Sequence, residues 1–140
     1  MTWQGPKLSF QDCAAQSVSL ADLAAGTDGL IVGIGAGWCE PCQEDAPLLE
    51  AFHTAHPELG LATILVEDAD GAPVTRLFCE EWVEEFGLTY PVLVDPLVTT
   101  SEYIGDGGLP VHVAWAPDGT EVYRASGTFV AADVLAALGR

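Results

Sequence analysis

The chain has 140 residues, the size of a single domain, and 49% of them are apolar, enough to form a hydrophobic core without metal ions or many disulfides. Only 4 lysine and arginine residues oppose 21 aspartate and glutamate residues, which gives a net charge of -17. Such a chain repels phosphate groups and anionic lipid, so we expect neither nucleic acid nor a membrane surface as a partner.

The sequence also lacks the features of a membrane-inserted chain. No apolar run comes near the roughly 20 residues that a membrane-spanning helix needs. Residues 1–7 do not contain the apolar stretch of a signal peptide. We therefore expect no membrane insertion by this sequence.

The first 29 residues are predicted to form an N-terminal hairpin extension within one domain of residues 1–140. Two short β-strands, at 8–10 and 17–20, flank a polar turn, and a short helix at 21–25 follows them. A break rich in glycine then precedes the next element.

Strands and helices alternate through the rest of the chain. Residues 30–35 form a continuous apolar run, which is typical of a strand covered on both faces. After it, apolar residues recur at helical spacing over residues 39–56. The same criteria predict a strand at 61–66, a helix at 73–86, a strand at 91–95, a short helix at 98–104, strands at 111–115 and 121–126 joined by a turn at 117–119, and a helix at 130–138. This order predicts an α/β fold with a central mixed sheet and helices on both faces.

Cys39 and Cys42 form a Cys-x-x-Cys motif at the junction of a predicted strand and a predicted helix. The unpaired N–H groups of a helix N-terminus stabilise the thiolate form of a cysteine placed there, which prepares it for nucleophilic attack. Cys42 lies one helical turn further on, where its sulfur can reach Cys39. The pair can therefore cycle between dithiol and disulfide, and we expect Cys39 to be the exposed nucleophile and Cys42 the buried resolving thiol.

The residues around the motif argue against haem attachment and against zinc binding. A haem-attachment site would need histidine after Cys42, where the chain has Gln43. A zinc site would need His53, but this residue lies about 16 Å from Cys42 along the predicted helix, too far to share a metal ion. We expect no metal, and a purely structural disulfide is the remaining alternative.

Four stretches of the chain match the motifs of one known family. They are Trp38-Cys39-Glu40-Pro41-Cys42 with the residues up to Pro47, Tyr90 to Asp95, Gly108-Leu109-Pro110, and Pro117-Asp118-Gly119. Together they resemble the TlpA/ResA-like thioredoxins of bacteria, which are extracytoplasmic thiol-disulfide oxidoreductases with a thioredoxin-like fold. The resemblance extends over nearly the whole chain, the N-terminal hairpin included.

The resemblance implies roles for individual residues. Cys39 matches the attacking cysteine of the family, Cys42 the resolving cysteine, and Pro110 the cis-proline that lies against the disulfide. A cis bond at Pro110 would turn the backbone of Leu109 so that it pairs with an extended substrate. Substrate contacts are implied for Trp38, Glu40, Pro41, Leu109 and Pro110.

Asp45 falls where ResA-like members carry a glutamate implicated in proton handling. Gly33 stands where thioredoxin has a buried acid, so Asp45 or a water molecule would have to assist the deprotonation of Cys42. The alternative is that Asp45 is an exposed acid near the start of the helix, favoured by the helix dipole. Gly35-Ala36-Gly37 stands before Trp38 where the family usually has bulkier aromatic residues, and we expect this run to widen the groove.

The implied function is dithiol–disulfide exchange that reduces disulfides of exported proteins, in the periplasm or on a membrane-anchored lipoprotein whose signal is removed. The implied partners are protein thiols and disulfides and a membrane or periplasmic electron donor. The redox-active disulfide needs no further cofactor, and we expect a monomer. A thiol peroxidase of the same architecture is one alternative, although Ala36 stands where such enzymes carry Thr or Ser. A non-enzymatic acidic module that binds partners or acts as a chaperone is another.

Cys13 and Cys79 are not explained by the redox pair. Cys13 lies in the turn of the predicted hairpin and Cys79 midway along the helix predicted at 73–86. A bridge between them would close a loop of about 65 residues and hold down the N-terminal extension. Two free buried thiols and a second redox role are the alternatives.

The charges around the motif predict a low reduction potential for the Cys39–Cys42 pair. Glu40 and Glu44 place negative charge near the start of the helix, which disfavours the thiolate and so makes the disulfide harder to reduce. We expect a potential of about -270 mV, similar to that of thioredoxin. Equilibration with glutathione buffers measures it, and a value near that of strong oxidants such as DsbA would contradict this prediction.

Overall fold

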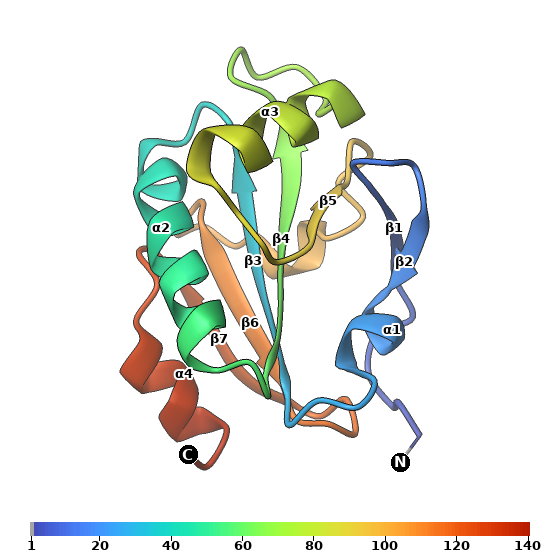
Figure 1. Cartoon of the computed structure of the whole chain (residues 1–140), viewed down its shortest axis with the longest axis vertical. Helices are drawn as coiled ribbons and strands as arrows, with labels where there is room; N and C mark the ends of the chain where they lie inside the picture. Colours follow the sequence, from blue (N-terminus) through green and yellow to red (C-terminus); the bar gives the residue numbers. More distant parts are fainter. Residues whose placement is uncertain (1) are drawn as a thin grey trace.

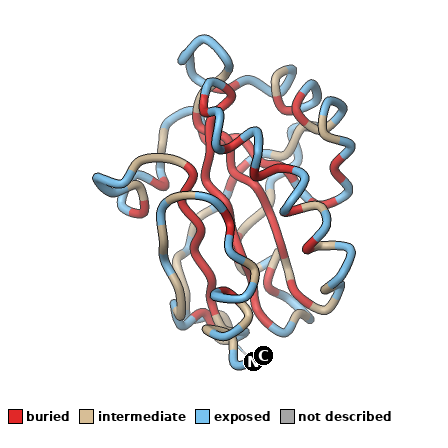
Figure 2. Tube along the Cα trace, turned by 90° about the vertical axis from the view of Figure 1, so that its left-hand side faces the viewer, coloured by how far each residue is buried: buried red, intermediate tan, exposed pale blue. Residues whose placement is uncertain are grey.

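The sheet is built around strand β3 (Leu30–Ala36), in which every residue is buried. In the computed structural model, which describes residues 2–140 and leaves Met1 outside the description, β3 pairs in parallel with β4 (Gly60–Glu67) and antiparallel with β6 (Val111–Trp115). A strand covered on all sides needs a continuous apolar sequence, and Leu-Ile-Val-Gly-Ile-Gly-Ala supplies one. The buried strands therefore form the centre of the molecule (Figure 2).

Four further strands extend the sheet on both sides of this centre. The described residues form seven strands in the order β2-β1-β5-β4-β3-β6-β7. The outer strands are β1 (Ser9–Asp12), β2 (Ser17–Ser19), β5 (Val92–Val94) and β7 (Glu121–Ser126). The pairs β3–β4 and β4–β5 are parallel and the others antiparallel, so the predicted mixed sheet is confirmed.

Helices α2 (Glu40–Ala55) and α3 (Arg76–Phe86) connect the parallel strands and lie on one face of the sheet (Figure 1). Right-handed crossovers from β3 to β4 and from β4 to β5 run in one direction across the sheet, which places both helices on the same side. Helix α4 (Ala131–Ala137) follows β7, and Phe129 before it packs edge-on against Phe52 of α2. These helices fix the side of the sheet on which the Cys-x-x-Cys motif lies.

The opposite side of β6 carries an aromatic cluster. Trp115 packs edge-on against Trp3 and against Tyr103 of η1 (Ser101–Tyr103), a single turn of 3-10 helix. Burial of large aromatic side chains in edge-to-face contact stabilises this layer. None of the helices in residues 2–140 has the length and the apolar character that crossing a membrane requires.

The N-terminal hairpin is joined to the sheet by few backbone contacts. Strand β1 pairs with β5 at only two positions, Gln11 with Val94 and Asp12 with Leu93. A disulfide between Cys13 and Cys79 links the hairpin to α3, and its sulfur atoms lie 3.9 and 3.4 Å from the carbonyl oxygen of Val92 on β5. The helix that follows, α1 (Leu20–Ala24), begins with a capping box between Ser19 and Asp22.

Two predicted helix boundaries are wrong. The helix expected from residue 73 begins at Arg76, because Thr75 caps it by accepting from the Phe78 backbone N–H, and Pro73 instead forms an isolated bridge with Glu67. The helix expected at 98–104 is reduced to η1. There the Asp95 carboxylate accepts backbone and hydroxyl hydrogen bonds from residues 99 and 100, which holds the chain in a turn.

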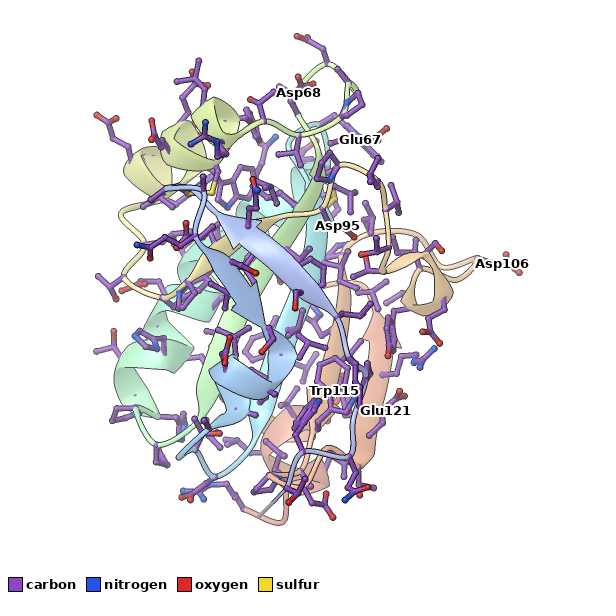
Figure 3. All side chains as sticks on the ribbon, turned by 90° about the vertical axis from the view of Figure 1, so that its right-hand side faces the viewer. Glu67, Asp68, Asp95, Asp106, Trp115 and Glu121 are labelled. Atoms are coloured by element: carbon purple, nitrogen blue, oxygen red, sulfur yellow. A yellow bond between two sulfur atoms is a disulfide. The ribbon has the colours of Figure 1, made fainter. Side chains whose placement is uncertain are left out.

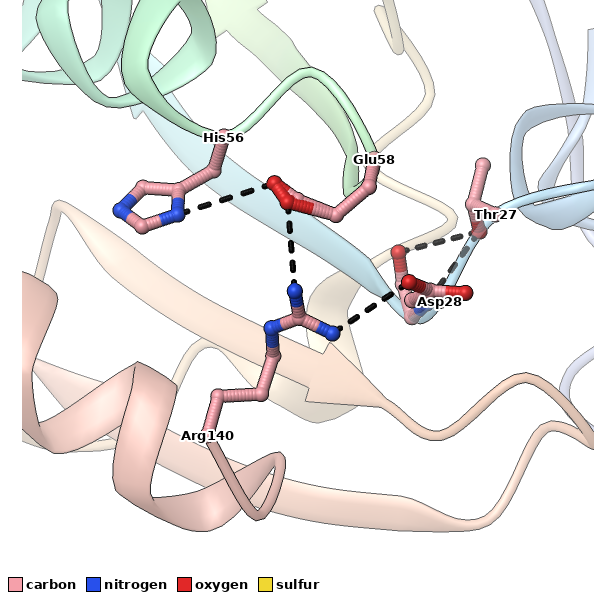
Figure 4. Close-up of polar contacts among 6 residues, drawn as sticks. Thr27, Asp28, His56, Glu58 and Arg140 are labelled. Carbon is pink, nitrogen blue, oxygen red and sulfur yellow. Dashed lines mark hydrogen bonds and ion pairs between the residues drawn. The ribbon is translucent and has the colours of Figure 1, made fainter.

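Arg140 connects α4 to the loops at the base of the sheet (Figure 4). Its guanidinium lies 3.3 Å from the Asp28 carboxylate and 3.2 Å from that of Glu58, and His56 lies 3.7 Å from Glu58. All four side chains are partly exposed, and ion pairs of this kind contribute at most about 1 kcal/mol each.

Removal of the Cys13–Cys79 bridge should destabilise the fold. The two cysteines are 66 residues apart, and on the chain-entropy model a loop of this size restricts the unfolded chain by about 4 kcal/mol. We expect a Cys13→Ala, Cys79→Ala double variant to lose much of this free energy of unfolding in denaturant titrations. Under reducing conditions neither protein has the bridge, so a difference in unfolding free energy that remains there between the double variant and the unmodified protein measures the effect of the lost side chains. An unchanged unfolding free energy in the oxidised double variant would contradict the prediction.

Candidate redox site

The first turn of α2 holds the two cysteines of the motif. Cys39 is the N-cap residue of the helix, and its sulfur accepts a hydrogen bond of 3.2 Å from the backbone N–H of Cys42. Pro41 lies in the first turn, where a missing N–H donor costs nothing. The two cysteines form a disulfide with their Cα atoms 5.2 Å apart.

Cys39 is less exposed than expected. In this disulfide form its exposed fraction is 3% and that of Cys42 is 4%, so the difference in exposure predicted for the dithiol form is not seen in the disulfide form. The cause is the N-cap geometry: the bond to Cys42 and the hydrogen bond from its N–H turn the Cys39 sulfur back over the helix. Trp38, the residue before Cys39, is 50% exposed, and its indole N–H donates to Glu67.

Pro110 lies beside the motif. The peptide bond between Leu109 and Pro110 is cis, at the residue before β6. Pro110 is buried and lines a small cavity together with Cys42, whereas Leu109 is half-buried. Among the implied substrate contacts, Trp38, Glu40 and Pro41 are exposed.

Asp45 is buried beneath the motif rather than exposed. Its exposed fraction is 2%, so the alternative of an exposed acid near the start of the helix is wrong. One carboxylate oxygen accepts from the backbone N–H of Phe129 at 2.7 Å, and the other lies 2.5 Å from Nε2 of His112 on β6. The physical reason is helical spacing: Cys42, Asp45 and Leu49 share the face of α2 that meets the sheet.

Glycines of β3 make room for these groups. A Cβ atom at Gly35 would lie 3.1 Å from the Cys42 sulfur, and one at Gly33 would lie 3.3 Å from the imidazole of His112. The cavity next to them, of about 10 Å³, is lined by residues of α2, α3, β3 and β4 and by the cis-proline before β6, and these include Gly33, Gly35, Cys42, Asp45, Thr63, Trp82 and Pro110. Asp45 and Cys42 therefore line the same cavity.

Gly37 does not widen the groove as expected. A Cβ atom there would lie 2.3 Å from the ring of Phe78 and 2.8 Å from the backbone of residues 68 and 69. Neighbouring atoms occupy the space that a side chain at residue 37 would need. Gly37 therefore permits α3 and residues 68–69 to pack closely against the backbone. Glu67 and Asp68 lie at this same end of the molecule (Figure 3).

Comparison with known proteins identifies the family. A family model described as "AhpC/TSA family" matches residues 2–111. The chain belongs to the AhpC/TSA family.

Individual relatives of this AhpC/TSA chain agree with the resemblance seen in the sequence, which is confirmed. It is 26% identical over 124 residues to the thiol-disulfide oxidoreductase ResA of Bacillus anthracis, and the match covers 89% of the chain and 68% of ResA. A putative thiol:disulfide interchange protein DsbE from Chlorobium tepidum has a TM-score of 0.76 at 19% identity, over 99% of this chain and 97% of that one. A secreted Mycobacterium tuberculosis disulfide oxidoreductase has a TM-score of 0.72 at 15% identity, over 95% of both chains. The thioredoxin-like fold is thereby confirmed.

His112 is the residue of this AhpC/TSA chain that sequence reasoning missed. It is 2% exposed and lies within an otherwise apolar strand, Val-His-Val-Ala-Trp. A histidine at the core-facing positions of a buried strand needs a polar partner. A histidine within an apolar strand, together with an aspartate on the apolar face of α2, is the sequence signal that could have revealed this contact.

A Gly35→Ala variant should disturb the redox site. The added methyl group would press on Cys42, which the helix and the disulfide hold in place, so we expect a loss of about 1 to 3 kcal/mol in unfolding free energy and slower disulfide exchange. Gly105→Ala is the matched control, since a Cβ there would meet no atom within 4 Å. Equal stability and exchange rates in the two variants would show that the space at Gly35 is not required.

Proposed function

We propose that this chain is a thiol-disulfide oxidoreductase that reduces disulfides of other proteins outside the cytoplasm. The observation that carries the proposal is the Cys39–Cys42 disulfide at the N-terminus of α2, with the cis-proline Pro110 beside it. The names of the ResA and DsbE relatives support the reaction class.

The reaction begins with the dithiol form. The Cys39 thiolate attacks one sulfur of a substrate disulfide, which forms a mixed disulfide and releases the other substrate sulfur as a thiolate that takes up a proton. Cys42 then loses its proton and attacks the Cys39 sulfur. This step breaks the mixed disulfide, forms the Cys39–Cys42 disulfide and releases the second substrate thiol, so two electrons pass from the protein to the substrate.

Asp45 accepts the proton of Cys42 in this scheme. It borders the same cavity as Cys42, and its carboxylate can accept more hydrogen bonds than the two that the structure gives it. A carboxylate positioned beside the group that it deprotonates can act as a general base. The deprotonated Cys42 then lies next to its target sulfur.

The substrate is an extended segment of another protein. The backbone beside the cis bond at Leu109 is suited to pairing with such a segment, and the half-exposed Trp38 provides an apolar contact beside the disulfide. A membrane or periplasmic electron donor returns the pair to its dithiol form, and no cofactor beyond the disulfide takes part. The chain acts as a monomer.

Two observations support an extracytoplasmic location. The Cys13–Cys79 disulfide is of a kind that persists in oxidising compartments and is rare in the cytosol. One structural neighbour is described as a secreted disulfide oxidoreductase.

Thiol peroxidase activity is less well supported. A peroxidase cysteine needs a neighbouring hydroxyl to orient the peroxide, and Ala36 stands three residues before Cys39. A chaperone role without redox chemistry would not require the cysteines. The cysteine variants below separate the chaperone role from disulfide exchange, and the comparison of hydrogen peroxide with insulin separates the peroxidase.

Cys39→Ser should abolish the reduction of insulin disulfides, while Cys42→Ser should accumulate mixed disulfides with the substrate. The first variant lacks the attacking thiolate, and the second cannot resolve the intermediate. Turbidity of reduced insulin and non-reducing gels measure the two effects, with the Cys13→Ala, Cys79→Ala variant as the active control. Full insulin reduction by Cys39→Ser, or faster turnover of hydrogen peroxide than of insulin by the unmodified protein, would contradict the proposed function.

A further inference from the structure

The buried histidine of β6 has no role in the scheme above, although it contacts the proposed base. His112 and Asp45 are 67 residues apart in sequence, both nearly free of solvent exposure, and their Nε2 and Oδ2 atoms are 2.5 Å apart. A hydrogen bond to a charged group is stronger than one between neutral groups, and burial strengthens it further. A buried polar pair of this kind at a reaction centre calls for a functional explanation.

We propose that His112 is a positioning residue of the exchange reaction: its Nε2–H holds the Asp45 carboxylate in the ionised form and in place to receive the proton of Cys42. This inference rests on the proposed function and adds a residue to it. His112 touches neither sulfur atom in this scheme and acts through Asp45.

The surroundings of the imidazole fit this role. Gly33 leaves the space in which the ring lies, since a Cβ there would be 3.3 Å from Cδ2 and 3.6 Å from Nε2 of His112. The ring also packs against Phe129, whose backbone N–H donates to the other carboxylate oxygen of Asp45. One donor comes from β6 and one from the segment before α4, so the carboxylate is fixed from two directions.

The other titratable groups near Asp45 do not take part in the proton transfer from Cys42. Burial, and to a smaller extent the Asp45 charge, raises the pKa of the Tyr90 phenol above its ordinary value, and the Tyr90 hydroxyl is paired with that of Thr63 at 3.0 Å. Tyr90 therefore stays neutral at the pH values at which thiols react. Glu50, on the same helix, is turned to the backbone N–H and hydroxyl of Thr89. Cys42 is the remaining group and shares the cavity with Asp45.

The proton and electron balance is that of the second exchange step. The Cys42 S–H bond breaks and its proton goes to the Asp45 carboxylate, while the sulfur electron pair forms the bond to Cys39. The electrons of the broken mixed disulfide leave with the substrate sulfur, which takes a proton from solvent. The proton held on Asp45 returns to Cys42 when the electron donor reduces the pair again. His112 keeps its Nε2–H throughout and is unchanged at the end of the cycle.

A two-phase reaction with a small aromatic disulfide tests the proposal. The protein is reduced at Cys39 and Cys42 only, which a count of two free thiols verifies. With excess aromatic disulfide, one coloured thiolate is released when Cys39 attacks and a second when Cys42 resolves the mixed disulfide. Stopped-flow absorbance between about pH 5 and pH 9 follows both phases separately.

His112→Leu removes the donor, which destabilises the ionised carboxylate, so we expect the midpoint of the second phase to move to higher pH by about one unit. The first phase should change by less than about twofold, because the cavity that Asp45 and Cys42 share is not lined by Cys39. His112→Gln should return the midpoint close to the original value. Its terminal amide reaches as far as imidazole Nε2 and still donates an N–H but does not titrate.

Asp95→Asn is the control for general destabilisation by a change in a buried hydrogen-bonded side chain. Asp95 is 3% exposed, accepts from Thr99 and Thr100, and lies at the end of β5, two strands away from β3. Its variant should be less stable but leave the second-phase midpoint unchanged. An unshifted midpoint in His112→Leu, an equal shift in His112→Gln, or the same shift in Asp95→Asn would overturn the role of His112. Absence of both phases in the unmodified protein would instead overturn the proposed function.

Discussion

The buried carboxylate of Asp45 is the constraint on which the redox site depends. Removing a carboxylate from water costs several kcal/mol unless donors replace the lost hydration. Here the donors come from β6 and from the segment before α4, while the carboxylate itself belongs to α2. The carboxylate on α2 therefore has both of its hydrogen bonds only when two distant parts of the chain have packed against the helix. The cysteines at its start are fixed by the same requirement.

Space is the second condition at this site, and β3 supplies it through small residues. A strand made only of branched residues would hold α2 away from the sheet, whereas Gly33 and Gly35 admit the His112 ring and the Cys42 sulfur. The strand keeps its pairing on both sides through its backbone. Helix α2 therefore packs closely on the sheet around a cavity of about 10 Å³, and Cys42 and Asp45 line this cavity.

The sequence predicts the main elements because their signals are local. The apolar run of β3, the helical spacing in α2 and the Cys-x-x-Cys motif each lie within a few residues. The start of α3 was misjudged because Thr75 offers a better cap than the proline before it. The Asp45–His112 contact was not predicted because it depends on the register of β6 against β3, where His112 stands opposite Gly33. A helix face alone does not reveal which strand residue it meets.

The two edges of the sheet have a consequence for self-association. Unpaired strand edges are templates for adding strands from other molecules, and proteins avoid this with short, charged or irregular edges. One edge here is β2, three residues long and followed at once by α1; the other is β7, where Glu121 and Arg124 are exposed and the pairing with β6 is shifted near Trp115. With a net charge of -17, neighbouring molecules also repel one another. In the proposed function, the backbone beside the cis-proline is thus open to an extended substrate while the sheet edges remain poor sites for aggregation.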